Sequence, residues 1–192
     1  MIGGNGRVDM TAVARGVTLS PTDRGQILQG MLTLPAHPDV RDGLQAMRDA
    51  GLRLVALTNS APAAVQQQLA NAGLATFFER SFSVDTVRRF KPAPEAYRSV
   101  AESLGVPVDR LRLVAAHAWD VVGALRAGCA AAFVARPGKV LYPLGPKPDI
   151  TGPDFRSVAT LIVAAETQQA DGPPPEASGG VRAHRGGRGG SD

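Results

Sequence analysis

The sequence of 192 residues contains one cysteine, Cys129, so no disulfide can form within a single chain. It has no run of about 20 apolar residues, the length that a membrane-spanning helix needs. Its first ten residues also lack the apolar stretch typical of a signal peptide. These absences predict a soluble protein of a reducing compartment, which we expect to be the cytoplasm.

Aromatic residues are scarce, at 5% of the sequence, and the 21 basic residues are mixed with 17 acidic ones. No basic stripe alternates with aromatic side chains, so we expect no nucleic-acid partner. Residues 167–192 contain three arginines, are rich in Gly and Pro, and carry too little apolar surface to offset the cost of ordering the chain. We predict a disordered tail there, with an arginine-glycine nucleic-acid-binding tail as the minority alternative.

Short apolar runs alternate with longer amphipathic segments between residues 40 and 165. The runs predict strands at 52–57, 81–84, 111–116 and 130–135, and the amphipathic segments predict helices at 40–50, 62–72, 94–104, 121–127 and 155–165. A glycine follows four of these helices, where a residue in the left-handed region typically ends a helix: Gly51, Gly73, Gly105 and Gly128. Because the apolar runs are continuous, the strands should be covered on both faces, as in a parallel doubly wound α/β sheet.

A helix start precedes this region, with Ser20 followed by Pro21 at the first helical position. Together with residues 11–15, it predicts one or two helices outside the sheet, which could form part of a cap. We therefore divide the chain into a partial helical cap (1–36), an incomplete α/β core (37–166) and the tail (167–192).

Polar residues that end a buried strand are the candidates for function, because ligands of open parallel sheets bind beyond the carboxyl ends of the strands. Thr58 and Asn59 follow the first predicted strand and offer a hydroxyl and an amide, although Asn59 or Ser60 could simply cap the next helix. Lys91 is followed by two prolines, Pro92 and Pro94, which fix its position just before a helix that carries Tyr97, and the alternative for Lys91 is a solvated charge.

A third cluster follows the strand at 111–116. His117 lies in a short loop, and Asp120 opens a helix that is rich in small residues. A packed loop histidine and a capping aspartate are the structural alternatives for these two residues.

The three clusters, in this order, resemble motifs of a known family. Leu-Thr-Asn-Ser-Ala-Pro (57–62), Val-Arg-Arg-Phe-Lys-Pro-Ala-Pro-Glu-Ala-Tyr (87–97) and Val-Ala-Ala-His-Ala-Trp-Asp-Val-Val-Gly-Ala (114–124) are similar to the second, third and fourth motifs of the haloacid dehalogenase (HAD) superfamily. Within it, the chain resembles the type II (L-)2-haloacid dehalogenases, over residues 18–165. The resemblance implies a HAD-like Rossmannoid fold with helices on both faces of a parallel sheet.

The resemblance also implies a reaction that needs no metal and no cofactor. An aspartate attacks the carbon that bears the halogen of a small 2-haloacid, and water hydrolyses the resulting ester. Lys91 would keep that aspartate ionised, because a nearby opposite charge lowers the pKa of a carboxyl group. Thr58 and Asn59 would bind the carboxylate of the nucleophile or of the substrate.

The same resemblance implies roles for three further residues and an assembly. Asp120 would orient Lys91 and help to place the water, and Tyr97 would line the pocket. His117 stands where several members carry asparagine, and it could still bond to the water. Relatives commonly form homodimers, so a homodimer is possible.

Two departures from the superfamily pattern keep alternatives open. Ala116 stands where the phosphatases carry a magnesium-binding aspartate, which makes a phosphatase variant the weaker enzymatic interpretation. The first motif, a strand ending in Asp-x-x-Gly-Thr, has no match, and Asp9 lacks both the strand before it and the glycine after it.

We therefore expect a sequence that begins partway through the cap, without the central nucleophile strand, and that is inactive or nearly so alone. The alternative class is a non-catalytic binding module, possibly completed by a strand from another chain. The missing strand should either leave a gap in the sheet or let its two neighbours pair directly, which would disperse Thr58, Lys91 and Asp120.

Overall fold

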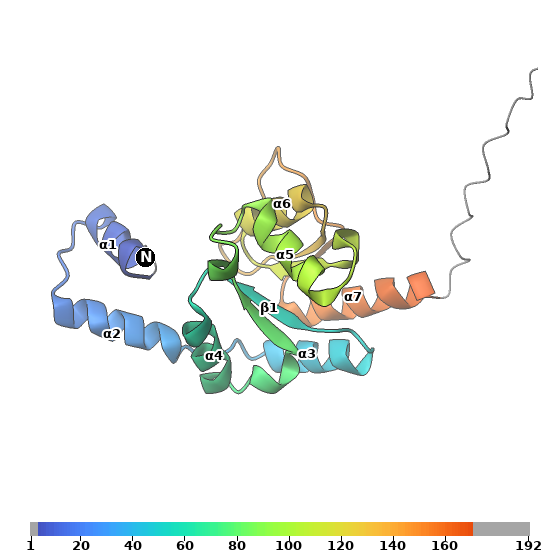
Figure 1. Ribbon diagram of the computed structural model, residues 1–192, viewed down its shortest axis with the longest axis horizontal. Helices are drawn as coiled ribbons and strands as arrows, with labels where there is room; N and C mark the ends of the chain where they lie inside the picture. The colour runs from blue at the N-terminus through green and yellow to red at the C-terminus, as the bar shows by residue number, and fades with distance from the viewer. Residues whose placement is uncertain (1–3, 171–192) are drawn as a thin grey trace, which may run out of the picture.

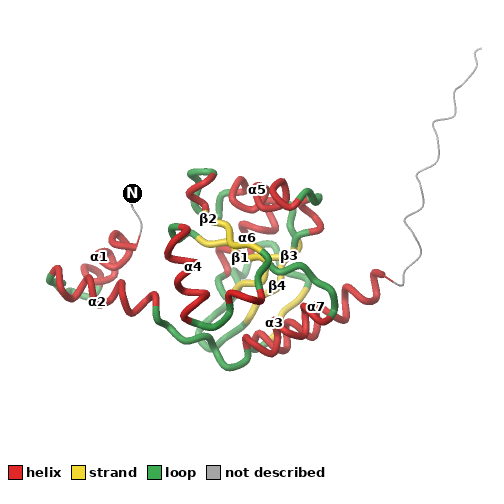
Figure 2. Tube along the Cα trace, turned by 60° about the horizontal axis from the view of Figure 1, so that its bottom comes forward, coloured by secondary structure: helices red, strands yellow, loops and turns green. Residues whose placement is uncertain are grey.

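The computed structural model of the chain describes residues 4–170, which form two parallel half-sheets with helices around them (Figure 2). The first half-sheet pairs β1 (Val55–Thr58) with β2 (Arg80–Ser83). The second has the order β3 (Arg112–Ala115), β4 (Ala130–Val134), β5 (Ile150–Gly152). The four predicted strands are confirmed, with ends displaced by up to three residues. β5 was not predicted, because three residues that end in glycine give no apolar run.

Seven α-helices occupy the described residues, and the five predicted in the core are all present. They are α3 (Val40–Asp49), α4 (Pro62–Asn71), α5 (Pro94–Leu104), α6 (Ala118–Ala127) and α7 (Phe155–Ala170). Single turns of 3-10 helix join some elements: η1 (Ala75–Phe77), η2 (Val84–Thr86) and η3 (Val108–Arg110). The four helix-ending glycines have positive φ, as predicted.

Two helix limits differ from the prediction. α6 begins at Ala118, three residues early, because the backbone carbonyl of His117 already accepts the first helical hydrogen bonds. α7 continues to Ala170 instead of residue 165, so the start predicted for the tail at residue 167 is wrong. There the Thr167 hydroxyl donates to the Val163 carbonyl one turn earlier, which lets a polar residue continue the helix. The rest of the predicted tail, 171–192, lies outside the described residues.

The helices α3 and α7 lie side by side and connect the two half-sheets (Figure 1). Gly43 permits their close approach, because a Cβ there would lie 2.6 Å from Phe155 Cδ1. Just before α3, the Asp39 carboxylate accepts hydrogen bonds from the Arg136 guanidinium at 2.9 Å and from the Phe155 backbone N–H at 2.6 Å. Burial raises the pKa of Asp39, but these bonds outweigh it and leave the pKa below its ordinary value.

The first two helices form a hairpin at one end of the molecule (Figure 1), consisting of α1 (Gly4–Ala14) and α2 (Pro21–Leu32). The predicted helix start is confirmed, since Ser20 and Asp23 form a reciprocal capping box. Asn71 of α4 donates to the Leu32 carbonyl at 2.9 Å and so helps to attach the hairpin to the core. That the hairpin of α1 and α2 is part of a cap stays a prediction. Within residues 4–170, no helix combines the length and the apolar character needed to cross a membrane.

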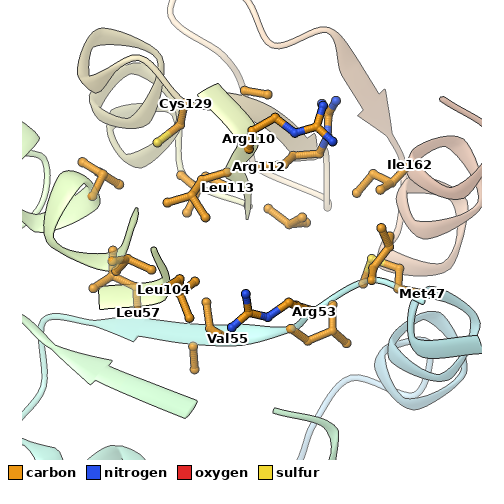
Figure 3. A pocket seen from close by; sticks show the side chains of 18 of the residues that line it. Met47, Arg53, Val55, Leu57, Leu104, Arg110, Arg112, Leu113, Cys129 and Ile162 are labelled. Atoms are coloured by element: carbon orange, nitrogen blue, oxygen red, sulfur yellow. The ribbon is translucent and has the colours of Figure 1, made fainter. Parts of the chain in front are cut away.

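Within the same residues, no strand lies between β1 and β3, and these two strands do not pair with each other. The space between them is a cavity of about 820 Å³, which we call the slot (Figure 3). Of the two expectations for a sheet without its central strand, direct pairing is wrong for the described residues, in which β1 and β3 belong to separate sheets. The dispersal of Thr58, Lys91 and Asp120, which was expected only from direct pairing, is therefore wrong as well.

Candidate active site

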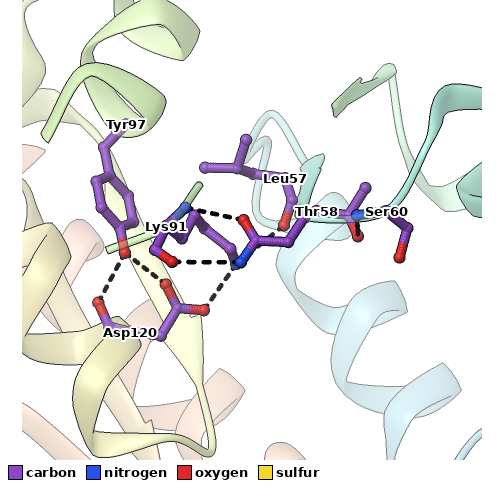
Figure 4. A network of polar contacts seen from close by, with 7 residues as sticks. Leu57, Thr58, Ser60, Lys91, Tyr97 and Asp120 are labelled. Atoms are coloured by element: carbon purple, nitrogen blue, oxygen red, sulfur yellow. Dashed lines mark hydrogen bonds and ion pairs between the residues drawn. The ribbon is translucent and has the colours of Figure 1, made fainter. Parts of the chain in front are cut away.

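Lys91 joins the two half-sheets at the carboxyl ends of β1 and β3 (Figure 4). Its Nζ donates to the Asp120 carboxylate at 2.7 Å, just after β3, and to the Leu57 backbone carbonyl of β1 at 3.1 Å. The side chains of Lys91 and Asp120 are only 10% and 8% exposed. A solvated surface lysine, the alternative weighed for Lys91, is therefore wrong.

The Lys91 backbone is fixed by Asn59. The Asn59 Oδ1 accepts from the Lys91 N–H at 2.8 Å, and the Asn59 Nδ2 donates to the Lys91 carbonyl at 3.3 Å. Neither Asn59 nor Ser60 caps α4, because the N-cap residue is Ala61 and no side chain caps that end. Thr58 accepts the Ser60 N–H at 3.0 Å, so it shapes the turn that presents Asn59 to Lys91.

The Asp120 carboxylate is held from its other side by Tyr97. The Tyr97 hydroxyl donates to Asp120 Oδ1 at 2.7 Å, while Oδ2 accepts from Lys91. Burial raises the pKa of Tyr97, and the hydrogen bond to Asp120 raises it further, so the phenol remains a proton donor throughout the ordinary pH range. Asp120 is not the N-cap residue of α6, because His117 occupies that position.

His117 lies at the rim of this cluster. Its side chain is exposed, with Nε2 at 3.3 Å from Lys139 Nζ and its ring at 5.8 Å from the Trp119 ring. The Trp119 ring in turn lies 5.9 Å from Lys91 Nζ. The structure thus brings Thr58, Asn59, Lys91, Tyr97 and Asp120 together, whereas His117 is connected to them through Trp119.

Gly123 supports the site from α6, a role that was not predicted from the sequence. A Cβ at this position would lie 2.6 Å from Tyr97 Oη and 2.6 Å from Pro92 Cβ. In the sequence, Gly123 was one of several small residues of a helix, and only the packing distinguishes it. The absence of a side chain lets α6 approach both the segment of Lys91 and the tyrosine that holds Asp120.

The substitution Gly123→Ala is expected to lower the free energy of unfolding by about 1–3 kcal/mol, because Pro92 and Tyr97 must both move. Urea denaturation of the variant and the wild type would measure the difference. The matched control is Gly30→Ala in α2, where a Cβ would meet nothing within 4 Å. Alanine there should leave stability unchanged or raise it by a few tenths of a kcal/mol up to about 1 kcal/mol. Equal effects of the two substitutions would contradict this account of Gly123.

The chemistry available to the cluster is that of a positioned ammonium. The Lys91 ammonium is held between the Leu57 carbonyl and the Asp120 carboxylate at the end of the open slot. The Asn59 amide and the Thr58 hydroxyl lie beside it. Such a cation favours the ionised form of any carboxylate that comes within about 4–6 Å. Within residues 4–170, no group of three or more His, Cys, Asp or Glu side chains is arranged to hold a metal ion.

Comparison with known proteins identifies relatives of this chain. The family model described as haloacid dehalogenase-like hydrolase matches residues 7–128. The haloacetate dehalogenase H-2 of Moraxella sp. (strain B) is 33% identical over 71% of this chain and 61% of its own length. An (S)-2-haloacid dehalogenase of Pseudomonas sp. (strain YL) is 29% identical over 78% of this chain and 65% of its own. The chain thus spans less than two thirds of the length of these relatives.

Solved structures agree with the sequence matches. The L-2-haloacid dehalogenase from Xanthobacter autotrophicus, with chloropropionic acid covalently bound, has a TM-score of 0.72 and 27% sequence identity. The similarity covers 80% of this chain and 71% of that one. A HAD phosphatase from Thermococcus onnurineus has a TM-score of 0.62 at 22% identity and shares the fold.

Proposed function

Because the chain belongs to the haloacid dehalogenase-like hydrolase family, we propose that Lys91 and its neighbours are the supporting part of an active site that hydrolyses a small 2-haloacid. The family predicted from the three motifs is confirmed by the match. The observation that carries the proposal is the position of the Lys91 ammonium, which lies at the carboxyl ends of β1 and β3 and faces the slot. A carboxylate entering there would be held in its ionised, nucleophilic form.

The reaction has two steps. The carboxylate oxygen attacks the carbon that carries the halogen, the carbon–halogen bond breaks, and the halide leaves with the bonding electron pair. Water then adds to the carbonyl carbon of the ester, whose acyl C–O bond breaks to release a 2-hydroxy acid and regenerate the carboxylate, with one proton lost to solvent. Splitting the displacement in this way replaces one difficult step with two easier ones.

Each residue of the cluster has a task in this scheme. Asp120 keeps Lys91 in place, and Tyr97 keeps Asp120 in place, because the two oxygens of the carboxylate are divided between them. Asn59 fixes the backbone of Lys91, and together with Thr58 it offers polar groups to a substrate carboxylate. His117, at the rim, is suited to contacting the attacking water.

The attacking carboxylate has to reach Lys91 through the slot. Asp9, the acidic residue considered from the sequence, lies in α1 and accepts a hydrogen bond from Arg24 at 2.9 Å, in the hairpin outside the half-sheets. It is therefore no candidate for the nucleophile. We expect the 192-residue chain to hydrolyse 2-haloacids only when a further segment brings an aspartate beside Lys91.

Halide release from racemic 2-chloropropionate and from chloroacetate would test the function. The chain alone should give the background rate, and a fusion that adds an apolar strand ending in aspartate before residue 4 should release chloride and form the 2-hydroxy acid. The matched control is the same fusion with asparagine in place of that aspartate, which should stay at background. Equal turnover by the two fusions would contradict the proposal, as would turnover by the chain alone that survives Asn59→Ala and Lys91→Arg.

The two alternatives gain no support from the relatives matched by sequence, which are named as dehalogenases, and the HAD phosphatase at 22% identity shares the fold alone. A non-catalytic module would be indicated if the fusion were folded and released no halide. Magnesium-dependent hydrolysis of a phosphomonoester would be needed to support a phosphatase variant.

A further inference from the structure

We propose that Lys139 is a positioning residue for His117, because its ammonium fixes the His117 imidazole as the neutral tautomer that carries its hydrogen on Nδ1. In this form, His117 meets the attacking water as a hydrogen-bond donor and does not take a proton from it. The tautomer follows from the geometry around His117 alone. Its use in the hydrolysis of the ester rests on the proposed function.

The contact between the two side chains joins Lys139 Nζ to His117 Nε2 over 3.3 Å. A hydrogen bond needs a donor and an acceptor, and a lysine ammonium has three donors and no acceptor. Amines are more basic than imidazoles by several powers of ten, so the proton in this contact belongs to the lysine. His117 Nε2 is therefore the acceptor, and the hydrogen of the neutral ring lies on Nδ1.

A charged imidazolium is disfavoured at this position. Both of its nitrogens are donors, so its Nε2–H would meet an ammonium that accepts nothing. Two positive charges only a few ångströms apart also repel each other. The other charged groups near the ring are Lys91, which contacts the Trp119 ring, and Asp120, which pairs with Lys91, so these two add no net charge. Lys139 therefore favours the neutral ring.

His117 is held by its backbone and by its ring. Its carbonyl accepts the N–H groups of Asp120 and Val121, both at 3.1 Å, because His117 is the N-cap residue of α6. Its side chain does not cap the helix, so the ring nitrogens serve other partners. The ring lies 5.8 Å from the Trp119 ring at an angle of 38°. These contacts place the imidazole beside Lys139.

The backbone of Lys139 is fixed by a tight turn just after β4. The turn begins at Arg136, whose carbonyl accepts a hydrogen bond from the Lys139 N–H at 2.8 Å. Pro137 and Gly138 occupy its two central positions, and Gly138 has a φ of 76°, as a type II turn requires. Arg136 is anchored in turn, because its guanidinium donates to both carboxylate oxygens of Asp39. Lys139 thus starts from a defined position.

The chain that follows Lys139 is anchored as well, in the loop between β4 and β5 that rises beside α6 (Figure 1). Leu141 packs against a buried cluster that includes Val121 of α6 and Phe133 of β4. Further along, Lys147 Nζ donates to the Pro143 carbonyl at 3.1 Å and closes the loop. Lys139 therefore lies between two fixed points, the turn before it and Leu141 after it.

The tautomer determines what a ligand finds at the rim of the site. Because Nε2 accepts from Lys139, a water molecule that meets Nδ1 meets a hydrogen-bond donor. A ring of the opposite tautomer would offer a lone pair at Nδ1 and would be able to act as a general base. The contact with Lys139 thus makes His117 a group that orients the water, as an amide N–H would.

The test is nitrogen-15 NMR of the 192-residue chain with labelled histidine at pH 8. The chain has three histidines, and His117→Gln identifies the signals of His117. Its Nδ1 should carry hydrogen and its Nε2 a lone pair, whereas an unconstrained neutral histidine favours hydrogen on Nε2. In Lys139→Met, the ratio of the Nδ1–H form to the Nε2–H form should fall by about tenfold. A wild-type ring with hydrogen on Nε2, or an unchanged ratio in the variant, would overturn the proposal.

Two further variants separate this contact from a general effect of the loop. Lys139→Arg keeps a charged donor and should retain the Nδ1–H form. Lys147→Met removes another ammonium of the same loop and should leave the ratio unchanged, because that ammonium binds the carbonyls of Tyr142 and Pro143. Loss of the Nδ1–H form in Lys139→Arg, or a shift in Lys147→Met as large as that in Lys139→Met, would overturn the assignment.

The use of the tautomer is tested on the fusion that adds the nucleophilic aspartate. Lys139→Met should lower its kcat by about two- to tenfold at pH 8 and change KM less, because His117 then offers a lone pair to the water. The loss should shrink below about pH 6, where the ring becomes an imidazolium and donates from both nitrogens. A loss that stays constant with pH would indicate a structural role for Lys139 and overturn the positioning role. A fusion that releases no halide would contradict the proposed function alone, since the spectra assign the tautomer without turnover.

Discussion

Lys91→Met is expected to lower the free energy of unfolding by about 3–5 kcal/mol, because it leaves a buried carboxylate without its cation. Asp120 is 8% exposed and would retain only the hydrogen bond from Tyr97. The same substitution also removes the contact that joins the Leu57 carbonyl of one half-sheet to the other. Urea denaturation at neutral pH would measure the loss.

A double-mutant cycle tests the cause of this loss. Asp120→Asn alone should also be destabilising, and the double variant should be less destabilised than the sum of the two single variants, since the unpaired charge is then gone. Arg53→Met provides the matched control, because its ion pair with Glu79 is about half exposed and should contribute only about 0–1 kcal/mol. Equal losses for Lys91→Met and Arg53→Met, or additive losses in the cycle, would contradict the role given to the buried pair.

Cys129 is expected to react with iodoacetamide at pH 8 about 100-fold more slowly in the folded chain than in the chain unfolded in urea. Burial raises the pKa of this thiol from 9.0 to about 11, and only the thiolate reacts. The rate should rise about tenfold for each pH unit until the pH approaches that pKa. Mass spectrometry of the alkylated chain at several times and pH values would measure it.

The position of Cys129 makes this reaction a probe of the slot as well. Its side chain lines the cavity and is 6% exposed, so any molecule that fills the cavity should slow alkylation further. Since Cys129 is the single cysteine of the sequence, the site of modification is unambiguous. A folded chain whose thiol reacts as fast as the unfolded one would show that the slot does not shield it.

Much of the fold could be predicted because strands covered on both faces leave continuous apolar runs, and helices between them end at glycines. Four strands and five helices of the core followed from these signals. The limits of α6 and α7 were not predicted, because a helix starts and continues through backbone hydrogen bonds that polar or small side chains tolerate. The strand β5 was not predicted either. Tertiary contacts decide such positions, and sequence propensity is only a weak guide to them.

Part of the candidate site could be predicted for a simple geometric reason. Asn59, Lys91 and Asp120 each follow a strand or precede a helix at the same edge of a parallel sheet, so their convergence follows from topology. The contact between Lys91 and the Leu57 carbonyl could not be predicted, because a backbone oxygen has no sequence signature. The importance of Gly123 also depends on packing alone.

The contact between α3 and α7 has a consequence for the biosynthesis of the chain. Phe155, whose backbone N–H donates to the Asp39 carboxylate, lies 116 positions after Asp39 in the sequence. At the usual speed of translation, about 5–20 residues per second, roughly 6–23 seconds separate their appearance. Throughout that interval α3 lacks α7, the helix that packs against it in the folded chain, so the apolar side of α3 stays uncovered until α7 leaves the ribosome.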